Sequence, residues 1–193
     1  MKHQYLPILE NQAIAENLYR LTFIWESPQP LPLPGQFATV RCTAFTDPLL
    51  RRPLAVASFD ESTGEAGIIY QRRGKATASL AEKKAGDTLD ILGPLGNSFP
   101  LPEHDTVPIL IAGGIGLGPI LFLYSALRLQ GCTPLLIVGF RTKSAIPFAI
   151  CNSPDTVFCT DDGTMGFHGT AGEYLKTVSL PAKTVLYACG PEG

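Results

Sequence analysis

The first hundred residues contain short runs in which apolar and polar side chains alternate. Alternation with a period of two is typical of a strand that is buried on one face. The five runs are Tyr19–Trp25, Gln36–Cys42, Ala55–Phe59, Ala66–Arg72 and Thr88–Leu92. Turn-forming residues separate them, such as the proline-rich stretch Pro28–Gly35. Several short strands at near-regular spacing predict a closed β-barrel. The segment Ala76–Lys84 predicts one short helix that ends before Gly86.

Beyond residue 100 the pattern changes to continuous apolar runs and helical spacing. Continuous apolar runs are typical of strands buried on both faces of a parallel sheet. The four runs are Val107–Ala112, Pro134–Gly139, Thr156–Thr160 and Thr184–Cys189. The segments Ile120–Gln130 and Glu173–Val178 predict helices. This order predicts a parallel sheet with helices on both faces. We therefore expect two domains, residues 1–101 and residues 102–193.

The composition narrows the class of protein. The chain has 193 residues, of which 45% are hydrophobic and 17% charged, with a formal net charge of −2. These values are ordinary for a globular protein and give no reason to expect a nucleic-acid partner. We expect no membrane span, because no apolar run reaches about 18 residues. The N-terminus has no signal-peptide pattern, so we expect a cytoplasmic protein.

The cysteines and histidines suggest no metal site in this sequence. The five cysteines are scattered and contain no CxxC pair, so we expect reduced thiols. The three histidines lie far apart along the chain. One of them, His168, falls in Gly166–Gly169, which we interpret as a loop.

A glycine cluster lies between the predicted strand at 107–112 and the helix that follows. The segment Ile111–Pro119 reads IAGGIGLGP. Glycines at such a place let the backbone approach a pyrophosphate, and the helix N-terminus offers free N–H groups. The register differs from the GxGxxG fingerprint, because Gly118 and Pro119 follow Gly116. Two interpretations stay open: a dinucleotide site, or a tight turn that needs glycine for steric reasons.

The ends of the later strands are a second candidate region. Ligands of open α/β sheets bind at the carboxyl ends of the strands. Asp161 and Asp162 follow one strand, and Cys189-Gly190-Pro191 ends the next. The two carboxylates would accept hydrogen bonds from ribose hydroxyls and repel a 2′-phosphate, which favours NADH over NADPH. The alternative is that Asp161-Asp162-Gly163 is a surface turn.

Two basic segments in the barrel half are candidates for binding anions. Arg51 and Arg52 stand side by side in an apolar context, where arginine can pair with a diphosphate. The alternative for them is a solvated strand end. In Ile68–Thr77 an apolar strand leads through basic residues and Gly74 into the predicted helix, where Thr77 could hold a phosphate. Together with the glycine cluster, these segments suggest two nucleotide cofactors.

These segments together, in this order, resemble the electron-transfer subunits of class B dihydroorotate dehydrogenases, in the ferredoxin-NADP reductase superfamily. The matching segments are Pro34–Phe37, Leu50–Pro53, Ile69–Tyr70 with Gly74 and Thr77, Gly86–Asn97, Gly113–Gly116 with Pro119, Gly139–Lys143, Thr160–Gly163 and Tyr187–Pro191. The resemblance implies a six-stranded Greek-key FAD-binding barrel, followed by a parallel-sheet nicotinamide-binding domain.

The resemblance also implies a role for each matching residue. Those expected to line the flavin are Arg52, on the FAD phosphates, with Pro53, Leu54, Ala55, Ile69, Tyr70 and Gln71. Those expected at the FAD pyrophosphate are Gly74, Ala76 and Thr77. Those expected at NADH are Gly113, Gly114 and Gly116 on the pyrophosphate, and Cys189, Gly190 and Pro191 near the nicotinamide. Hydride would pass from nicotinamide C4 to flavin N5, so the reacting atoms belong to the cofactors and no side chain is expected to be catalytic.

The implied function is electron transfer between NADH and a partner through FAD. The expected partner is the catalytic dehydrogenase subunit of pyrimidine biosynthesis. The alternatives are another protein electron acceptor, as in sulfite reductase, hydrogenase or ferredoxin:NADP oxidoreductase complexes, or a flavin-binding protein without turnover.

The sequence departs from the family in three places. Ala55 stands where the family has serine or threonine, and Ala76 where it has glycine. The family also carries a [2Fe–2S] domain with four cysteine ligands, whose spacing is absent from this chain. The sequence ends at Gly193, inside the nicotinamide motif. We therefore expect either a truncated chain or a relative without the cluster.

Overall fold

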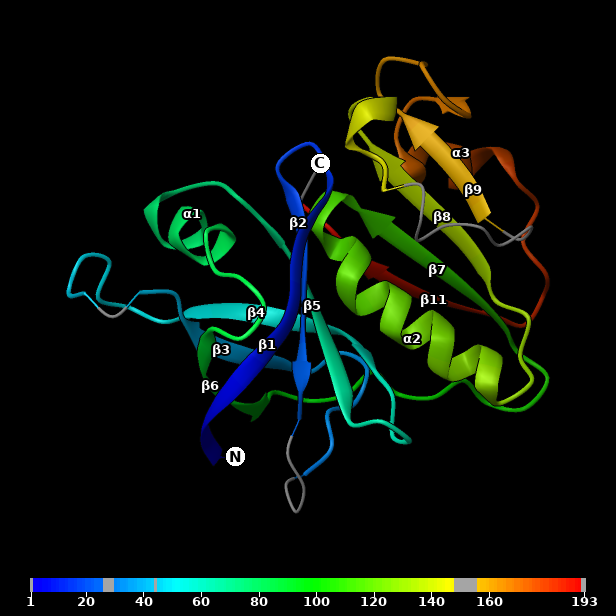
Figure 1. Cartoon of the computed structure of the whole chain (residues 1–193). Coiled ribbons are helices and arrows are strands. Elements are labelled where there is room, and N and C mark those ends of the chain that lie inside the picture. The colour runs from blue at the N-terminus through cyan, green and yellow to red at the C-terminus, as the bar shows by residue number, and fades with distance from the viewer. Residues whose placement is uncertain (1, 26–29, 44, 148–155, 192–193) are drawn as a thin grey trace.

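The protein folds into a β-barrel followed by a parallel sheet that helices cover (Figure 1). The computed structural model describes residues 2–25, 30–43, 45–147 and 156–191. The closed barrel and the parallel sheet confirm both parts of the predicted fold.

Six antiparallel strands close the barrel in the order β1-β2-β5-β4-β3-β6. The elements are β1 (Lys2–Ala15), β2 (Leu18–Ile24), β3 (Phe37–Arg41), β4 (Arg52–Phe59), β5 (Glu65–Gln71), α1 (Lys75–Ala81) and β6 (Thr88–Leu95). Strand β6 pairs with both β1 and β3, and this double pairing closes the barrel.

Alternate residues of these strands form the barrel core, as the period of two requires. The larger core side chains are Leu6, Ile8, Leu21, Phe23, Trp25, Val40, Ile68, Tyr70, Leu89 and Ile91. Helix α1 adds Ala76 and Leu80 to the same cluster. Ala76, in the first turn of α1, is thus held against the barrel interior.

Strand β1 is absent from the predicted elements. Its alternation is hidden because apolar side chains lie on both faces. Leu6 and Ile8 are buried, whereas Tyr5 and Leu9 are 65% and 41% exposed. The strand pairs with β6 as far as Pro7 and with β2 from Ile8 onward, so one strand serves two neighbours.

The second domain is a five-stranded parallel sheet in the order β10-β9-β8-β7-β11. Its strands are β7 (Val107–Gly113), β8 (Leu135–Phe140), β9 (Thr156–Thr160), β10 (Phe167–His168) and β11 (Thr184–Cys189). The helical elements are η1 (Gly114–Gly116), α2 (Leu117–Leu129), η2 (Lys143–Ala145) and α3 (Ala171–Thr177). Helix α2 packs with one face of the sheet and α3 with the other, as predicted.

Strand β10 corrects the prediction of a loop at Gly166–Gly169. Phe167 and His168 pair in parallel with Cys159 and Thr160 of β9. A strand of two residues between glycines is too short to show any periodicity in the sequence.

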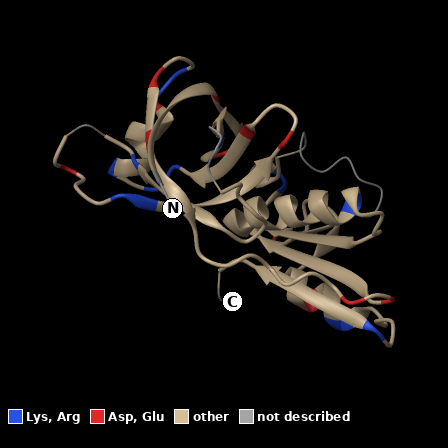
Figure 2. Ribbon diagram, turned by 90° about the horizontal axis from the view of Figure 1, so that it is seen from below, with Lys and Arg blue, Asp and Glu red and all other residues tan. Residues whose placement is uncertain are grey.

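Helix α2 lies between the sheet and the barrel. It begins three residues before the predicted start and takes Pro119 into its first turn, where a backbone N–H is not needed. It carries one charged residue, Arg128 in the last turn, and Figure 2 shows the rest of this helix without charge. In the part of the chain that the structure describes, no helix has the length and apolarity needed to cross a membrane.

The two domains pack against each other through the start of α2. A Cβ added at Gly118 would lie 3.4 Å from the Cβ of Ala57 and 3.5 Å from that of Ile69, so this helix rests directly on β4 and β5. The Tyr187 hydroxyl also donates to the Pro100 carbonyl at 2.8 Å. The predicted boundary between residues 101 and 102 falls between β6 and β7, and its position stays a prediction.

Candidate functional site

The carboxyl ends of β7 and β11 meet in a cluster of small residues. A Cβ added at Gly116 would overlap the carbonyl oxygen of Cys189. One added at Gly190 would lie 2.9 Å from the Cα of Gly113, and one at Gly113 would lie 3.3 Å from Pro191. The structure thus brings together the two segments predicted to hold the pyrophosphate and the nicotinamide of NADH. Their roles stay predictions.

The same cluster has the features that a dinucleotide phosphate needs. Gly114 has φ +49°, and a Cβ added there would meet no atom within 4 Å, so its backbone is open to a ligand. No side chain caps the first turn of α2. The positive end of the dipole of this 13-residue helix favours an anion. These residues therefore fit the pyrophosphate of a nicotinamide dinucleotide.

The predicted flavin residues of β4 and β5 lie beside this cluster, because α2 rests on those two strands. Pro53 and Gln71 are exposed, and Leu54 and Ala55 are half-buried. Ile69 is buried in the cluster of apolar side chains that includes α2. Strands β4 and β5, which carry most of the predicted flavin residues, thus lie next to the helix that follows the predicted NADH glycines.

Tyr70 is the predicted flavin residue with the most restricted side chain. Its ring lies in the barrel core, stacked on Tyr19 at 5.5 Å, and its hydroxyl donates to Asn11 Oδ1 at 2.9 Å. Burial raises the pKa of Tyr70 well above its usual value, and the hydrogen bond with Asn11 only partly offsets this. Only the backbone of Tyr70 is therefore available to a ligand outside the barrel.

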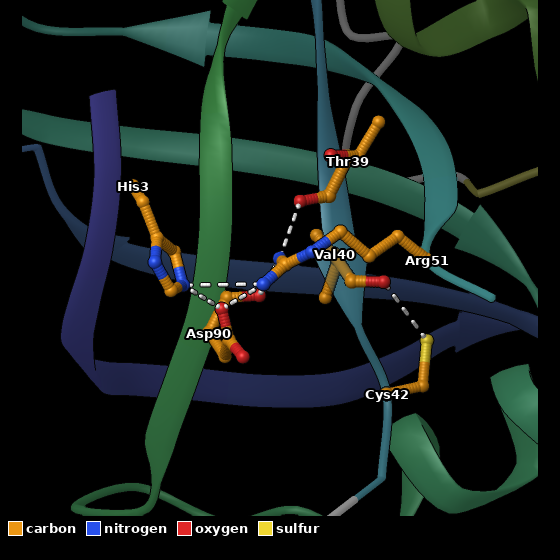
Figure 3. Close-up of polar contacts among 6 residues, drawn as sticks. All are labelled: His3, Thr39, Val40, Cys42, Arg51 and Asp90. Atoms are coloured by element: carbon orange, nitrogen blue, oxygen red, sulfur yellow. Dashed lines mark hydrogen bonds and ion pairs between the residues drawn. The ribbon is translucent and has the colours of Figure 1, made fainter. Parts of the chain in front are cut away.

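The two adjacent arginines have different surroundings, of which Figure 3 shows those of Arg51. Arg51 Nη2 lies 2.6 Å from Asp90 Oδ1, and Arg51 Nη1 donates to the Asp90 and Thr39 carbonyls at 3.2 and 3.4 Å. Arg52 Nη1 donates to the Leu50 carbonyl at 3.1 Å and has no acidic partner among the described residues. Of the two, Arg52 is the one free to bind a phosphate.

At the start of α1, Thr77 is already engaged with its own helix. Its hydroxyl oxygen accepts from the Arg73 and Gly74 amides at 2.9 and 3.3 Å. Ala76 is buried in the barrel core. The predicted pyrophosphate contacts of Gly74, Ala76 and Thr77 stay untested, and Thr77 would have to exchange these hydrogen bonds to bind a phosphate.

Asp161 and Asp162 line two different shallow pockets at the surface. Asp161 lines one of about 500 Å³ beside β10 and α3, with His168 and Lys176. Asp162 lines one of about 470 Å³ at the ends of β8 and β9. Asp162 Oδ1 accepts from the Thr164 hydroxyl and amide at 2.6 and 3.0 Å, and these bonds hold its pKa below the usual value. Asp162 therefore stays ionised at neutral pH.

The sequence analysis gave no role to the other residues of this second pocket, which are Thr142, Lys143, Ser144 and Thr164. Thr142 and Lys143 belong to the matching segment Gly139–Lys143, and Ser144 and Thr164 lie outside the matching segments. The available signal was their place directly after the carboxyl end of β8 or β9, where ligands of parallel sheets bind.

The described residues do not fit a [2Fe–2S] cluster. No group of three or more His, Cys, Asp or Glu side chains suited to a metal occurs within them. Cys42, Cys132, Cys159 and Cys189 are free thiols, and Cys151 lies outside the described residues. Burial raises the pKa of Cys42 and Cys189, and that of Cys159 to about 11.

Gly116→Ala tests the contact between β7 and β11. The added methyl group would overlap the Cys189 backbone, so we expect a loss of about 1–3 kcal/mol in the free energy of unfolding. Thermal and urea unfolding measure it. Gly172→Ala is the control, because a Cβ there meets only Thr170 Oγ1 at 3.9 Å. Equal stability of the two variants would contradict the contact.

Asp90→Asn tests the ion pair with Arg51. Burial acts to raise the pKa of Asp90, but hydrogen bonds from Arg51 and His3 and their charges outweigh it and lower the pKa. A lowered pKa stabilises the fold above the ordinary aspartate value and loses that contribution as the pH falls through the folded-state value. We expect the variant to lose about 1–3 kcal/mol at neutral pH. Urea unfolding should show this difference shrinking below about pH 4. A difference that does not change with pH would contradict the assignment.

Comparison with known proteins places the chain in a family. No protein-family model matches it. One relative is the dihydroorotate dehydrogenase B (NAD(+)), electron transfer subunit, of Geobacillus kaustophilus (strain HTA426). It is 40% identical over an alignment that covers 97% of this chain and 74% of that protein. The protein of the same name from Bacillus mycoides (strain KBAB4) is 32% identical over 99% of this chain and 75% of its own length.

Solved structures show the same fold. The NADH-dependent reduced ferredoxin-NADP oxidoreductase, studied for flavin-based electron bifurcation, is 26% identical with a TM-score of 0.81, over 96% of this chain and 67% of that one. The ferredoxin reductase of carbazole 1,9a-dioxygenase is 21% identical with a TM-score of 0.83, over 98% and 61%. Because the identity to the curated relatives extends over almost the whole chain, this protein belongs to the family of dihydroorotate dehydrogenase B electron-transfer subunits.

Proposed function

We propose that this chain binds FAD and NADH and transfers electrons between NADH and the catalytic subunit of a dihydroorotate dehydrogenase, in pyrimidine biosynthesis. Its relatives are named as the NAD(+)-linked electron-transfer subunits of that enzyme. The structural relative at 26% identity is NADH-dependent and is studied for flavin chemistry. A cytoplasmic location stays a prediction from the sequence.

The observation that carries the proposal is the contact of α2 with the barrel. Gly118 allows the helix that opens at the glycine cluster to rest against Ala57 of β4 and Ile69 of β5. The strands that carry predicted flavin residues therefore lie against the helix that follows the predicted NADH glycines. Two rings held together at such a junction need little further ordering before they react.

The residues of the junction supply binding and alignment. The flavin and the nicotinamide, when bound, supply the electron-transfer chemistry itself. Arg52 offers a guanidinium without an acidic partner among the described residues to the flavin phosphates. Gly114 exposes its backbone beside the α2 N-terminus, where the nicotinamide dinucleotide phosphates would lie. Ala55 offers no hydroxyl, so no side-chain hydrogen bond reaches the flavin from that position.

The comparisons favour dihydroorotate dehydrogenase over other electron-accepting complexes. Identity is 40% to the named dihydroorotate dehydrogenase subunit and 26% to the ferredoxin-NADP oxidoreductase. A flavin-binding protein without turnover stays the alternative that Ala55 suggests.

Absorbance spectroscopy tests the proposed function. We expect the purified chain to bind FAD and the flavin bands to bleach when NADH is added without oxygen. Addition of the dihydroorotate dehydrogenase catalytic subunit should then produce a stable complex on size-exclusion chromatography. Flavin bands that persist with NADH would support the alternative without turnover, and a chain that binds no flavin would contradict the proposal.

Asp162→Asn tests the preference for NADH. Asparagine keeps an oxygen for the two Thr164 hydrogen bonds but removes the charge that repels a 2′-phosphate. We expect the ratio of kcat/KM for NADH over that for NADPH to fall about tenfold, which corresponds to 1.4 kcal/mol. Asp60→Asn is the matched control, because Asp60 accepts the same pair of hydrogen bonds from Ser62, at 2.8 and 2.6 Å, in the barrel domain. An unchanged ratio in Asp162→Asn would show that its carboxylate does not select the dinucleotide.

A further inference from the structure

Arg51 links four strands of the barrel from a position just before β4. Its guanidinium crosses β3, where it meets the Thr39 carbonyl, and reaches β6, where it contacts both the carbonyl and the carboxylate of Asp90. His3 Nε2 of β1 lies 3.1 Å from Arg51 Nη2 and 2.6 Å from Asp90 Oδ1. Figure 3 shows the three side chains converging. The side chains of Arg51 and Asp90 are 27% and 15% exposed, so this ion pair is more shielded from water than an ordinary surface pair.

The segment before Arg51 has little packing of its own. Phe45, Leu49 and Leu50 are 79%, 62% and 71% exposed. The Asp47 carboxylate lies 2.8 Å from Lys75 Nζ, but both side chains are about three-quarters exposed. Exposed ion pairs contribute little to order. The end of this segment is therefore held mainly by the Arg51 contacts.

The orientation of Arg52 depends on this segment. Arg52 Nη1 donates to the Leu50 carbonyl at 3.1 Å and, more weakly, to the Arg51 carbonyl at 3.5 Å. Both carbonyls belong to the short stretch that the Arg51 side chain fixes. A continuous set of contacts thus runs from the Asp90 carboxylate through Arg51 to the guanidinium of Arg52.

We propose that Arg51, held by Asp90, is a positioning residue that orients Arg52 toward the phosphates of the flavin cofactor. The inference rests on the proposed function, because it assigns Arg52 to those phosphates. An arginine that is already oriented loses less conformational freedom on binding, so the contact gains affinity for the phosphate-bearing part of the ligand. The two neighbouring arginines thus have separate tasks, one inside the barrel wall and one toward the ligand.

The proposal predicts weaker binding only of a flavin that carries phosphate. In Arg51→Lys the charge is kept, but one ammonium group replaces the planar fork that reaches two carbonyls and a carboxylate. In Asp90→Asn the carboxylate is lost and the side-chain shape is kept. We expect both variants to bind FAD about tenfold more weakly, which corresponds to 1.4 kcal/mol. Riboflavin, which lacks phosphate, should bind each variant as it binds the unaltered chain. Fluorescence titration of the 193-residue chain with each flavin measures both.

Two further variants complete the test. Arg52→Gln removes the guanidinium proposed to bind the phosphates. It should weaken the binding of FAD at least as much as Arg51→Lys does. Glu65→Gln breaks the exposed pair with Arg20, at 3.7 Å on the same barrel, and should leave the binding of both flavins unchanged.

The outcomes separate the inference from the proposed function. If Arg51→Lys and Asp90→Asn lower thermal stability but leave the ratio of FAD to riboflavin affinity unchanged, the ion pair only stabilises the barrel and the inference is wrong. The inference is also wrong if these variants bind FAD and riboflavin more weakly by the same factor. If the unaltered chain binds neither flavin, the proposed function itself fails and the inference fails with it.

Discussion

The close approach of β7 and β11 at their carboxyl ends is the constraint on which the rest of the site depends. Gly116 has no room for a side chain against the Cys189 carbonyl, and Gly190 has none against Gly113. Because these backbones touch, the N-terminus of α2 begins at the same edge of the sheet where β11 ends. Gly118 then lets that helix rest on the barrel. The requirement for glycine at these positions thus fixes how the start of α2 lies between the sheet and the barrel.

The barrel contributes a different kind of constraint, which is electrostatic. Arg51 is committed to Asp90 and to backbone carbonyls, so of these two adjacent arginines it is Arg52 that remains for an anion. Placing a charged side chain among three neighbouring strands costs desolvation, which the carboxylate and carbonyl contacts offset. The barrel wall and the candidate phosphate site are therefore coupled through two consecutive residues.

Several features of the fold could be predicted from local pattern alone, and the exceptions have physical reasons. The four long runs of the parallel sheet formed strands, since continuous apolar sequence reflects burial on both faces. Strand β1 was missed because Tyr5 and Leu9 place apolar groups on its outer face. Strand β10 was missed because two residues carry no period. The adjacency of Asp161 and Asp162 suggested a common task, yet the turn that Thr164 closes sends them to different pockets.

The sequence by itself determined the fold class, a barrel followed by a parallel sheet, and the segments that mark the family, because periodicity and glycine placement are local properties. The tertiary structure alone decided that Arg51 is paired with Asp90, that the Tyr70 side chain lies inside the barrel, and that the glycine cluster meets Cys189-Gly190. Each of these depends on partners distant in sequence: Arg51 and Asp90 are 39 residues apart, and Tyr70 and Asn11 are 59 apart. Such contacts are set by how strands pair and close, and local pattern does not encode that pairing.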